Sequence, residues 1–271
     1  MRLIKKTIKK LLIKFLNLFN VIAHRSINKI LIFEFIKLFK IEIPSNLKLI
    51  RIGPNEDGGY LMPDILDEIE FCFSAGIGKN IQFEKDLLNY DIKSFGADNT
   101  ISSLPENIPN YDFIKKNINV WNDDNNITFK DWIDDKKPDN NNLIGQIDIE
   151  GDEYKLILNT PNETFKRFKI LIFEFHNIQK ISDRVILNYY SSSIQKLLIN
   201  FNICHIHINN AESFTKVNNI EIPHLLEITF LRKDFYKKEL KKNIIPHPLD
   251  KKNILDKEEI NFDNNWKKII L

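Results

Sequence analysis

Two patterns of hydrophobic and polar positions divide the chain near residue 40. In residues 1–22 the apolar side chains recur at helical spacing and the lysines fall on the opposite face, which is typical of a basic amphipathic helix. Residues 28–40 repeat this pattern and predict a second short helix. From residue 41 onward short apolar runs alternate with helical stretches, and this alternation predicts an α/β body.

The body contains six apolar runs that predict strands and three stretches that predict helices. We expect strands at 69–74, 91–97, 143–148, 170–175, 203–208 and 225–231, and helices at 80–89, 152–159 and 183–200. Because the strand runs do not alternate between apolar and polar residues, they favour a parallel sheet covered by helices on both faces. Residues 105–142 are rich in Asn, Asp and Pro, and predict loops around one weak strand and a short helix at 128–133.

The composition is that of a folded protein with one main domain. With 43% hydrophobic residues and 20 Phe in 271 residues, burial of apolar surface can offset the entropy of ordering, which excludes an intrinsically disordered protein. We expect this domain over residues 41–250, with a helical extension over 1–40 and a C-terminal tail over 251–271. Cys72 and Cys204 lie in predicted strands, so we interpret them as buried thiols in a reducing cytoplasm rather than as a disulfide or metal site.

Charge is distributed unevenly along the chain. Residues 1–40 hold ten Lys and Arg against one acidic residue, whereas the rest carries 29 basic and 36 acidic residues, so the body is mildly acidic. An acidic body excludes a general nucleic-acid-binding surface. Charged residues interrupt every window of about 18 residues that could span a bilayer, and no signal-peptide cleavage site follows. Two interpretations remain for residues 1–40: packing on the domain or a partner subunit, or peripheral contact with anionic lipid at the inner membrane face.

A glycine-rich turn follows the first core strand. Gly76 and Gly78 stand between this strand and a helix beginning near Asn80, so backbone can approach a ligand closely there. The third glycine of a dinucleotide motif is replaced by Ile81, which counts against NAD. Asp98 comes just after the second strand, where an acid accepts hydrogen bonds from a ribose. A glycine turn followed by an acid that can bind a ribose suits S-adenosylmethionine. The alternative is a strand–turn–helix that binds no ligand, in which Asp98 is only a surface acid.

Carboxylates and a histidine follow two further strands. Asp148 and Glu150 should lie at the carboxyl end of the strand predicted at 143–148, where ligands bind in open α/β sheets. Two acids this close can perform base chemistry or hold a divalent cation. Alternatively, Glu150 or Asp152 only caps the next helix. Glu174 and His176 share one side of the strand predicted at 170–175. This would bring His176 to the same crevice, where it could act as a base for a hydroxyl group.

A pair of histidines follows in the next strand. His205 and His207 share a face of that strand, and Glu227 opens the last strand. Paired histidines can bind a metal ion, but no cysteine or carboxylate spacing completes a zinc site, so we do not expect zinc.

In order and spacing, these segments resemble the FkbM family of class I S-adenosylmethionine-dependent methyltransferases over residues 48–250. The resemblance is carried by RIGPNEDGGYLMP (51–63), SAGIGKN (74–80), GADNT (96–100), IDIEGDE (147–153), IFEFH (172–176), HIHINN (205–210), IPHLLEITFLRKD (222–234) and IPHPLD (245–250). It implies a Rossmann-like, mostly parallel seven-stranded sheet in the order 3-2-1-4-5-7-6 with the last strand antiparallel. It also implies methyl transfer to oxygen, on sugars of cell-surface glycans or on small natural products.

The resemblance also implies roles for individual residues. The glycine turn would line the methionine part of the cofactor, Asp98 would bind the ribose, and the DGGY stretch would close over both. The cofactor-binding set is then Asp57, Gly59, Tyr60, Ser74, Gly76, Gly78, Asn80, Asp98 and Asn99. Class I enzymes often have an acid where this chain has Ser74, so the ammonium group of the cofactor must be bound by another residue, with Glu84 and Asp148 as candidates.

The sequence therefore predicts an S-adenosylmethionine-dependent O-methyltransferase acting on a hydroxyl of a sugar or surface-glycan precursor. We expect His176 or Asp148 as the base, with Glu150 orienting it or sharing a divalent cation. An NAD-dependent dehydrogenase fits the fold but not Ile81. A non-catalytic protein that keeps this fold and docks to a membrane or partner remains the other alternative.

Overall fold

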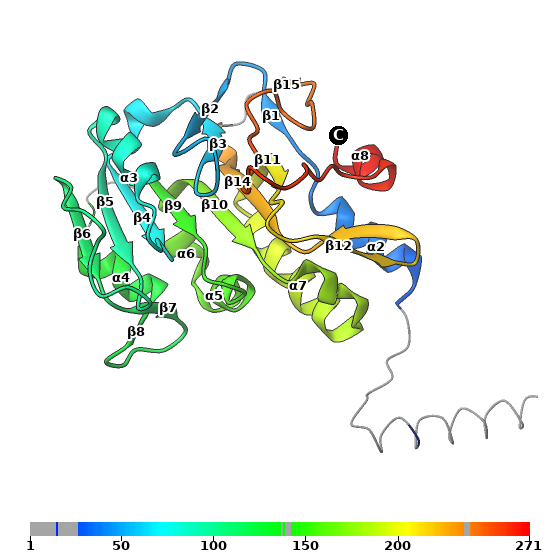
Figure 1. The fold of residues 1–271 in the computed structure, drawn as a ribbon, viewed down its shortest axis with the longest axis horizontal. Coiled ribbons are helices and arrows are strands. Elements are labelled where there is room, and N and C mark those ends of the chain that lie inside the picture. The colour runs from blue at the N-terminus through cyan, green and yellow to red at the C-terminus, as the bar shows by residue number, and fades with distance from the viewer. Residues whose placement is uncertain (1–14, 16–26, 137, 139–141, 236–238) are drawn as a thin grey trace, which may run out of the picture.

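The computed structural model describes residues 15, 27–136, 138, 142–235 and 239–271. The amphipathic helix predicted for residues 1–22 lies outside the described residues, except for Phe15. The remaining chain forms an α/β structure around one central sheet (Figure 1).

Seven strands form the central sheet, in the spatial order β11-β14-β10-β9-β4-β5-β6. The strands are β4 (Phe71–Ala75), β5 (Lys93–Ala97), β6 (Tyr111–Ile114), β9 (Leu143–Ile147), β10 (Phe168–Phe175), β11 (Phe201–Ile208) and β14 (Leu226–Arg232). Numbered along the chain, they lie in the order 3-2-1-4-5-7-6. From β10 to β6 all neighbours are parallel, and β14 is antiparallel to both β10 and β11. The prediction of a mostly parallel, Rossmann-like sheet is confirmed.

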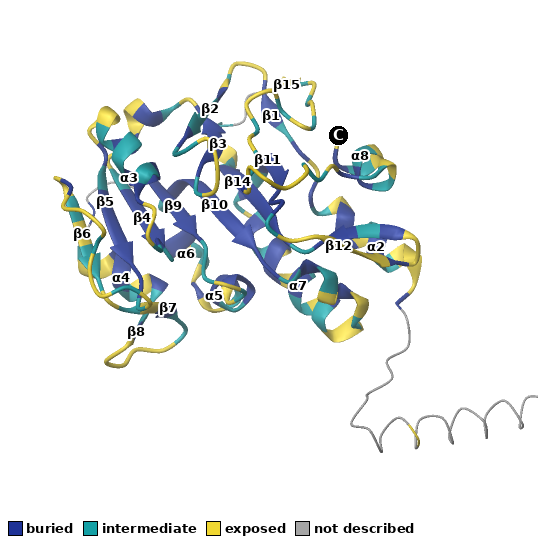
Figure 2. Cartoon of the chain, viewed as in Figure 1, coloured by how far each residue is buried: buried dark blue, intermediate teal, exposed yellow. Residues whose placement is uncertain are grey.

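The strands of the sheet centre are buried along their whole length. All eight residues of β10 and all five of β9 are buried, which explains why their sequences are mostly apolar and do not alternate. Figure 2 shows this buried layer in dark blue, with exposed positions mainly on the outer helix faces and loops. Cys72 and Cys204 are buried free thiols, as predicted.

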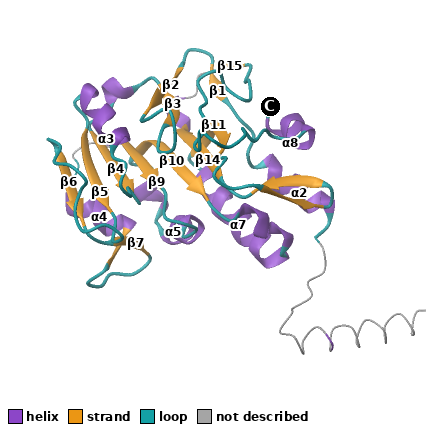
Figure 3. Ribbon diagram, in the orientation of Figure 1, coloured by secondary structure: helices purple, strands orange, loops and turns teal. Residues whose placement is uncertain are grey.

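Helices flank the sheet (Figure 3). They are α3 (Gln82–Leu87), α4 (Phe129–Lys136), α5 (Glu153–Asn159), α6 (Asn162–Phe165) and α7 (Arg184–Leu198). The three helices predicted in the body are present as α3, α5 and α7. The Asp183 side chain starts α7 by accepting hydrogen bonds from the backbone N–H groups of Val185 and Ile186. In the described part of the chain, no helix has the length and apolarity needed to cross a bilayer.

The Asn-rich segment before β9 is more ordered than its sequence indicates. In place of one weak strand it contains three: β6, β7 (Asn117–Asn119) and β8 (Asn126–Thr128). Asp123 accepts hydrogen bonds from Asn126 and Trp121, so polar side chains of the segment satisfy one another. Local composition predicted loops because it does not reveal this pairing.

Residues on either side of the body, in 27–39 and 262–270, contribute buried side chains to the main hydrophobic core. Helices α2 (Lys29–Lys37) and α8 (Asn264–Ile270) lie side by side (Figure 1). Phe39, just after α2, packs on Trp266 of α8 with ring centroids 5.6 Å apart. Both side chains are at most 1% exposed. Residues 28–40 and the final helix therefore pack against each other within the core.

Short strand pairs surround the main sheet and were not predicted. They are β1 (Ile43–Pro44) with β15 (Leu240–Lys241), β2 (Leu49–Ile52) with β3 (Tyr60–Pro63), β7 with β8, and β12 (Phe214–Val217) with β13 (Ile220–Pro223). The β2–β3 hairpin is joined to the sheet where the Thr229 hydroxyl of β14 donates to the carbonyl of Leu61. This contact places the turn of the hairpin, with its DGGY stretch, over the carboxyl ends of the central strands.

Candidate active site

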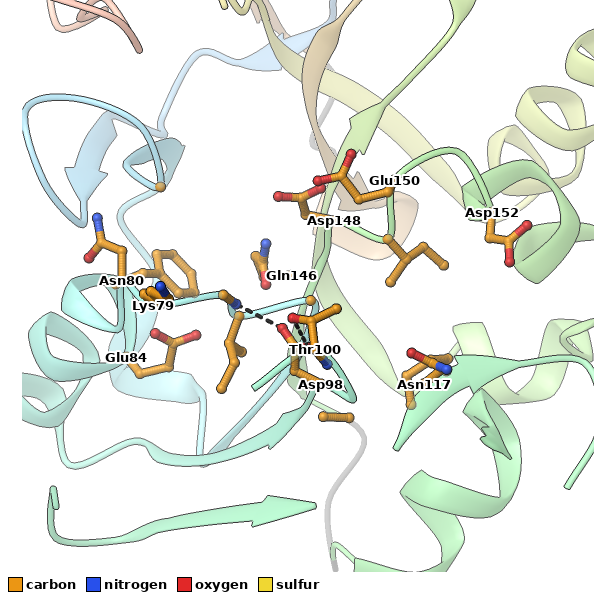
Figure 4. A pocket seen from close by; sticks show the side chains of 18 of the residues that line it. Lys79, Asn80, Glu84, Asp98, Thr100, Asn117, Gln146, Asp148, Glu150 and Asp152 are labelled. Atoms are coloured by element: carbon orange, nitrogen blue, oxygen red, sulfur yellow. Dashed lines mark hydrogen bonds between the residues drawn. The ribbon is translucent and has the colours of Figure 1, made fainter. Parts of the chain in front are cut away.

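A crevice of about 530 Å³ opens at the carboxyl ends of β4, β5 and β9. Its other walls are the β2–β3 turn, the start of α3 and strand β7. Figure 4 shows the acidic side chains Glu84, Asp98 and Asp148 arranged around Gln146. The position agrees with the rule that open α/β sheets bind ligands where the strand order reverses, here between β4 and β9.

The glycine turn forms one wall of this crevice. Gly76 has φ +76°, and a Cβ there would lie 1.6 Å from the carbonyl oxygen of Asp148, so only glycine allows the β4 turn to approach β9. Gly78 has φ +54°, and a Cβ there would meet no atom within 4 Å. Gly78 thus presents bare backbone to the open space of the crevice.

Asp98 connects the glycine turn to the loop after β5. Its Oδ2 accepts from the Gly78 N–H at 2.9 Å, and its Oδ1 accepts from the backbone and hydroxyl of Thr100, both at 2.6 Å (Figure 4). The carboxylate lines the crevice and is 6% exposed. The structure therefore brings Gly76, Gly78 and Asp98 together as predicted.

The β2–β3 turn closes over the glycine turn. The Asn80 side-chain amide donates to the carbonyl of Asp57 at 3.2 Å, and both residues line the crevice. Tyr60 also lines it and accepts a hydrogen bond from Gln146 at 3.3 Å. Burial raises the pKa of Tyr60 well above its ordinary value, and neighbouring carboxylates raise it further, so its phenol stays protonated.

Three residues of the predicted cofactor set do not line the crevice that the described residues form: Gly59, Ser74 and Asn99. The Cα–H of Gly59 faces the hairpin, because a Cβ there would lie 2.0 Å from the carbonyl of Pro54. Ser74 is fully buried beside the Cys72 thiol, 3.6 Å away. Asn99 follows Asp98 but contributes no surface to the cavity.

Glu84 of α3 places a carboxyl group next to Ser74 and on the wall of the crevice. It is 3% exposed, and its Oε2 has no hydrogen-bond partner among the described residues. Burial raises the pKa of Glu84 from 4.5 to about 7, against the smaller opposing effect of the Ser74 hydrogen bond. A helix residue thus supplies the acid that the strand end lacks.

Asp148, Glu150 and His176 form a second group at the crevice edge. The Nε2 atom of His176 lies 3.7 Å from Oδ1 of Asp148 and 3.5 Å from Oε2 of Glu150. Its Nδ1 atom lies 3.1 Å from the fully buried carboxylate of Glu153, which also accepts from the backbone of Gly151. The structure therefore brings the predicted trio together and adds Glu153, from the first turn of α5, as a partner of His176. Asp152 occupies the N-cap position of α5 without a side-chain cap hydrogen bond.

His176 and Asp148 differ in how the neighbouring charges shift their pKa values. Burial lowers the pKa of His176, but the hydrogen bond and charge of Glu153 and the charges of Asp148 and Glu150 outweigh it and raise this pKa to about 9. Burial raises the pKa of Asp148 to about 7, in spite of the opposing charge of His176. At neutral pH the imidazole keeps its proton, so Asp148, which also lines the crevice, is the better base.

The two histidines of β11, His205 and His207, pair with carboxylates. His205 Nε2 lies 2.9 Å from Asp250, and His207 lies 3.1 Å from both Glu227 and Glu259. Each of these imidazoles therefore has a carboxylate partner in the described structure. These pairs join the sheet to residues 250–259, which have no local sequence signal for such a role.

Gln146 is a crevice residue that sequence reasoning missed. It is 6% exposed, and its Oε1 has no hydrogen-bond partner among the described residues. A polar side chain inside an otherwise apolar run, as at residues 143–147, is the signal that could have identified it.

No family model and no curated protein matches this chain. Its functional assignment therefore depends on the crevice and on the motifs described above.

Proposed function

We propose that the protein is an S-adenosylmethionine-dependent O-methyltransferase that acts on a hydroxyl group of a sugar or surface-glycan precursor. The observation that carries this proposal is the acidic crevice in which Gly78 exposes backbone next to the buried carboxylate of Asp98. The motif resemblance to the FkbM family supports the same activity and is the basis for the acceptor class.

The charge of the crevice supports a cationic cofactor. Among the described residues that line it, six are acidic and one, Lys79, is basic. S-adenosylmethionine carries a sulfonium and an ammonium group, whereas the pyrophosphate of NAD carries negative charge. An acidic cavity with Ile81 at the third-glycine position therefore favours S-adenosylmethionine over NAD.

The residues of the crevice suit the parts of this cofactor. Asp98 would accept hydrogen bonds from the ribose, and the backbone of Gly76 and Gly78 would border the methionine part. Glu84 would bind the ammonium group. Its carboxyl group lies on the crevice wall, and its buried Oε2 has no hydrogen-bond partner among the described residues. A buried acceptor without a partner costs about 1–3 kcal/mol, which a bound cation removes.

When bound, the cofactor supplies a methyl group made electrophilic by its sulfonium. The chain has to hold the acceptor hydroxyl in line with that methyl and remove its proton. Asp148 lies at the cavity wall with a pKa of about 7, so a large fraction is ionised at neutral pH and can take the proton. Protonated His176 and buried Glu153 orient Asp148 from behind.

Calorimetric titration with S-adenosylmethionine, S-adenosylhomocysteine and NAD tests the proposal. We expect micromolar binding of the first two and none of NAD. Asp98→Asn should weaken binding by about tenfold or more, because the amide loses the charge and one acceptor. The matched control is Asp112→Asn, an exposed acid on the adjacent strand β6.

Two outcomes would overturn the proposal. Tighter binding of NAD than of S-adenosylmethionine would favour the dehydrogenase. Absence of any nucleotide binding by the folded protein would favour a non-catalytic docking protein with this fold.

A further inference from the structure

Gln146 is a buried polar residue of β9 that lies on the wall of the crevice. It is the direct partner of Ser74 in the parallel register of β9 with β4, so both side chains project from the same face of the sheet. Helix α3 covers this face, because the Ser74 hydroxyl forms a hydrogen bond with Glu84 of α3. Gln146 and Glu84 are therefore both neighbours of Ser74, and Figure 4 shows both beside the glycine turn.

The amide of Gln146 is oriented by Tyr60. Its Nε2 atom donates to the phenol oxygen of Tyr60 at 3.3 Å. The Tyr60 ring is buried and packs edge-on against Phe83 of α3, with ring centroids 5.5 Å apart. The nitrogen end of the amide is thus engaged, whereas the Oε1 atom is buried and has no hydrogen-bond partner among the described residues. Because buried polar atoms are normally hydrogen-bonded, this oxygen indicates that a bound molecule supplies a donor.

The charges around this oxygen restrict the chemistry of the donor. The Oε2 atom of Glu84 is also buried without a hydrogen-bond partner among the described residues, so two unpaired acceptors lie next to Ser74. Asp98 and Asp148 line the same crevice, and their carboxylates favour a cation over a neutral donor. An ammonium group carries three N–H donors on one atom, so it can donate to both acceptors at once.

We infer that the Oε1 atom of Gln146 and the Oε2 atom of Glu84 together bind the ammonium group of S-adenosylmethionine, an inference that rests on the proposed function. Gln146 then acts as a specificity residue. It favours a ligand with an amino group over the same nucleoside without one, because the second ligand would leave its oxygen unpaired. The roles proposed for Asp98 and Asp148 are unaffected, since Asp98 follows β5 and Asp148 lies two positions beyond Gln146, just after β9.

Calorimetric titration of the full-length protein with two ligands tests the inference. The first is S-adenosylhomocysteine, and the second is its deaminated analogue, in which hydrogen replaces the ammonium group. Gln146→Met removes the acceptor and keeps the length of the side chain. We expect this variant to weaken binding of S-adenosylhomocysteine by about tenfold, and to change binding of the analogue by less than about twofold.

Two further variants serve as controls. Gln146→Glu keeps an acceptor oxygen at the same position, so it should retain the affinity for S-adenosylhomocysteine. Gln195→Met makes the same replacement at an exposed position of α7, and should leave the affinity for both ligands unchanged. The melting temperature of each variant establishes that it is folded before its affinity is compared with that of the wild type.

Three outcomes would contradict the inference. Equal weakening of both ligands by Gln146→Met would overturn it, because the effect would then not concern the ammonium group. Unchanged binding of S-adenosylhomocysteine by Gln146→Met would also overturn it, by assigning a water molecule to the Oε1 atom. In both cases the wild type still binds S-adenosylhomocysteine, so the proposed function stands. A folded wild-type protein that binds neither ligand would overturn the proposed function, and this inference with it.

Discussion

Gly76 and Gly78 share a left-handed backbone but differ in the space around them. At Gly76 a Cβ would collide with the carbonyl of Asp148, at 1.6 Å, whereas at Gly78 it would enter open space. We expect Gly76→Ala to destabilise the fold by about 4 kcal/mol or more, because the β4 turn must move away from β9. Gly78→Ala should cost only about 1 kcal/mol. Urea unfolding of both variants measures the difference.

The two glycine substitutions also distinguish an effect on folding from an effect on ligand binding. The methyl group of Gly78→Ala would project into the crevice, so we expect a folded protein with weakened S-adenosylmethionine binding by calorimetry. Unchanged affinity would mean that the ligand does not approach this turn. Equal destabilisation by both substitutions would contradict the close approach of Gly76 to β9.

Glu84 should make the stability of the fold depend on pH. Its pKa is raised by burial from 4.5 to about 7, so the folded protein binds a proton more tightly than the unfolded chain. Its contribution to stability is complete below pH 4.5 and is lost as pH rises through 7. Glu84→Gln stays neutral at all pH values. Between pH 4.5 and 8, the variant should gain up to about 3 kcal/mol relative to wild type.

Urea unfolding at several pH values measures this change. The control is Glu106→Gln, in which the replaced glutamate is 53% exposed and pairs with Lys85 at the surface. Its stability should follow that of the wild type across the range. If the curve of Glu84→Gln also remains parallel to that of the wild type, Glu84 is not held as a buried acid.

At the scale of elements, α8 is a structural part of the domain. The Trp266 ring packs on Phe39 and Phe262, and its indole N–H donates to the carbonyl of Glu221 at 2.8 Å. Trp266→Ala should lower the free energy of unfolding by about 3–5 kcal/mol, because it leaves a cavity and an unpaired carbonyl. The exposed neighbour Lys268→Ala should change it by less than about 0.5 kcal/mol. A mobile tail would give two small effects of similar size.

Elements with a local signature were predictable, and elements that depend on distant partners were not. Strands such as β10 are mostly apolar runs, and α7 begins at an Asp cap, so both can be recognised over a few residues. The pairing of β1 with β15, nearly 200 residues later in the chain, has no such signature. Likewise, α8 looks like a polar tail until its buried Trp266 is placed against α2.

At the scale of the whole molecule, the separation of charge predicts how the chain meets a membrane. Residues 1–40 are strongly basic and the rest is acidic. We expect full-length protein to co-float with vesicles of anionic phosphatidylglycerol and not with neutral phosphatidylcholine. Replacing Lys5, Lys6, Lys9 and Lys10 together by Glu should abolish co-flotation, since these charges would then repel the surface.

A charge-matched control distinguishes a local site from net charge. In the control, four exposed body lysines are replaced by Glu: Lys48, Lys115, Lys242 and Lys251. This variant should still co-float. Equal loss in both variants would contradict a specific role for the N-terminal residues. Truncation is a poorer test than these substitutions when it removes α2, because Ile32, Phe35 and Ile36 of α2 are buried in the core.

The sequence by itself determined the α/β class, the strand runs of the central sheet and the position of the glycine turn before Asp98. Each of these depends on periodicity or on residue types that lie close together in the chain. Asp148 and His176 were also predictable as neighbours, because the carboxyl ends of adjacent parallel strands meet at one edge of a sheet.

Only the tertiary structure decided how these residues are paired and charged. It placed Glu84 beside Ser74, buried Glu153 against His176, and brought Asn253 to Asp57, 196 positions earlier in the chain. It also set the register in which Glu174 faces Glu227. Burial and register arise from contacts between distant segments, whereas sequence patterns report only the neighbourhood of each residue, so the chemistry of the crevice follows from folding and not from spacing.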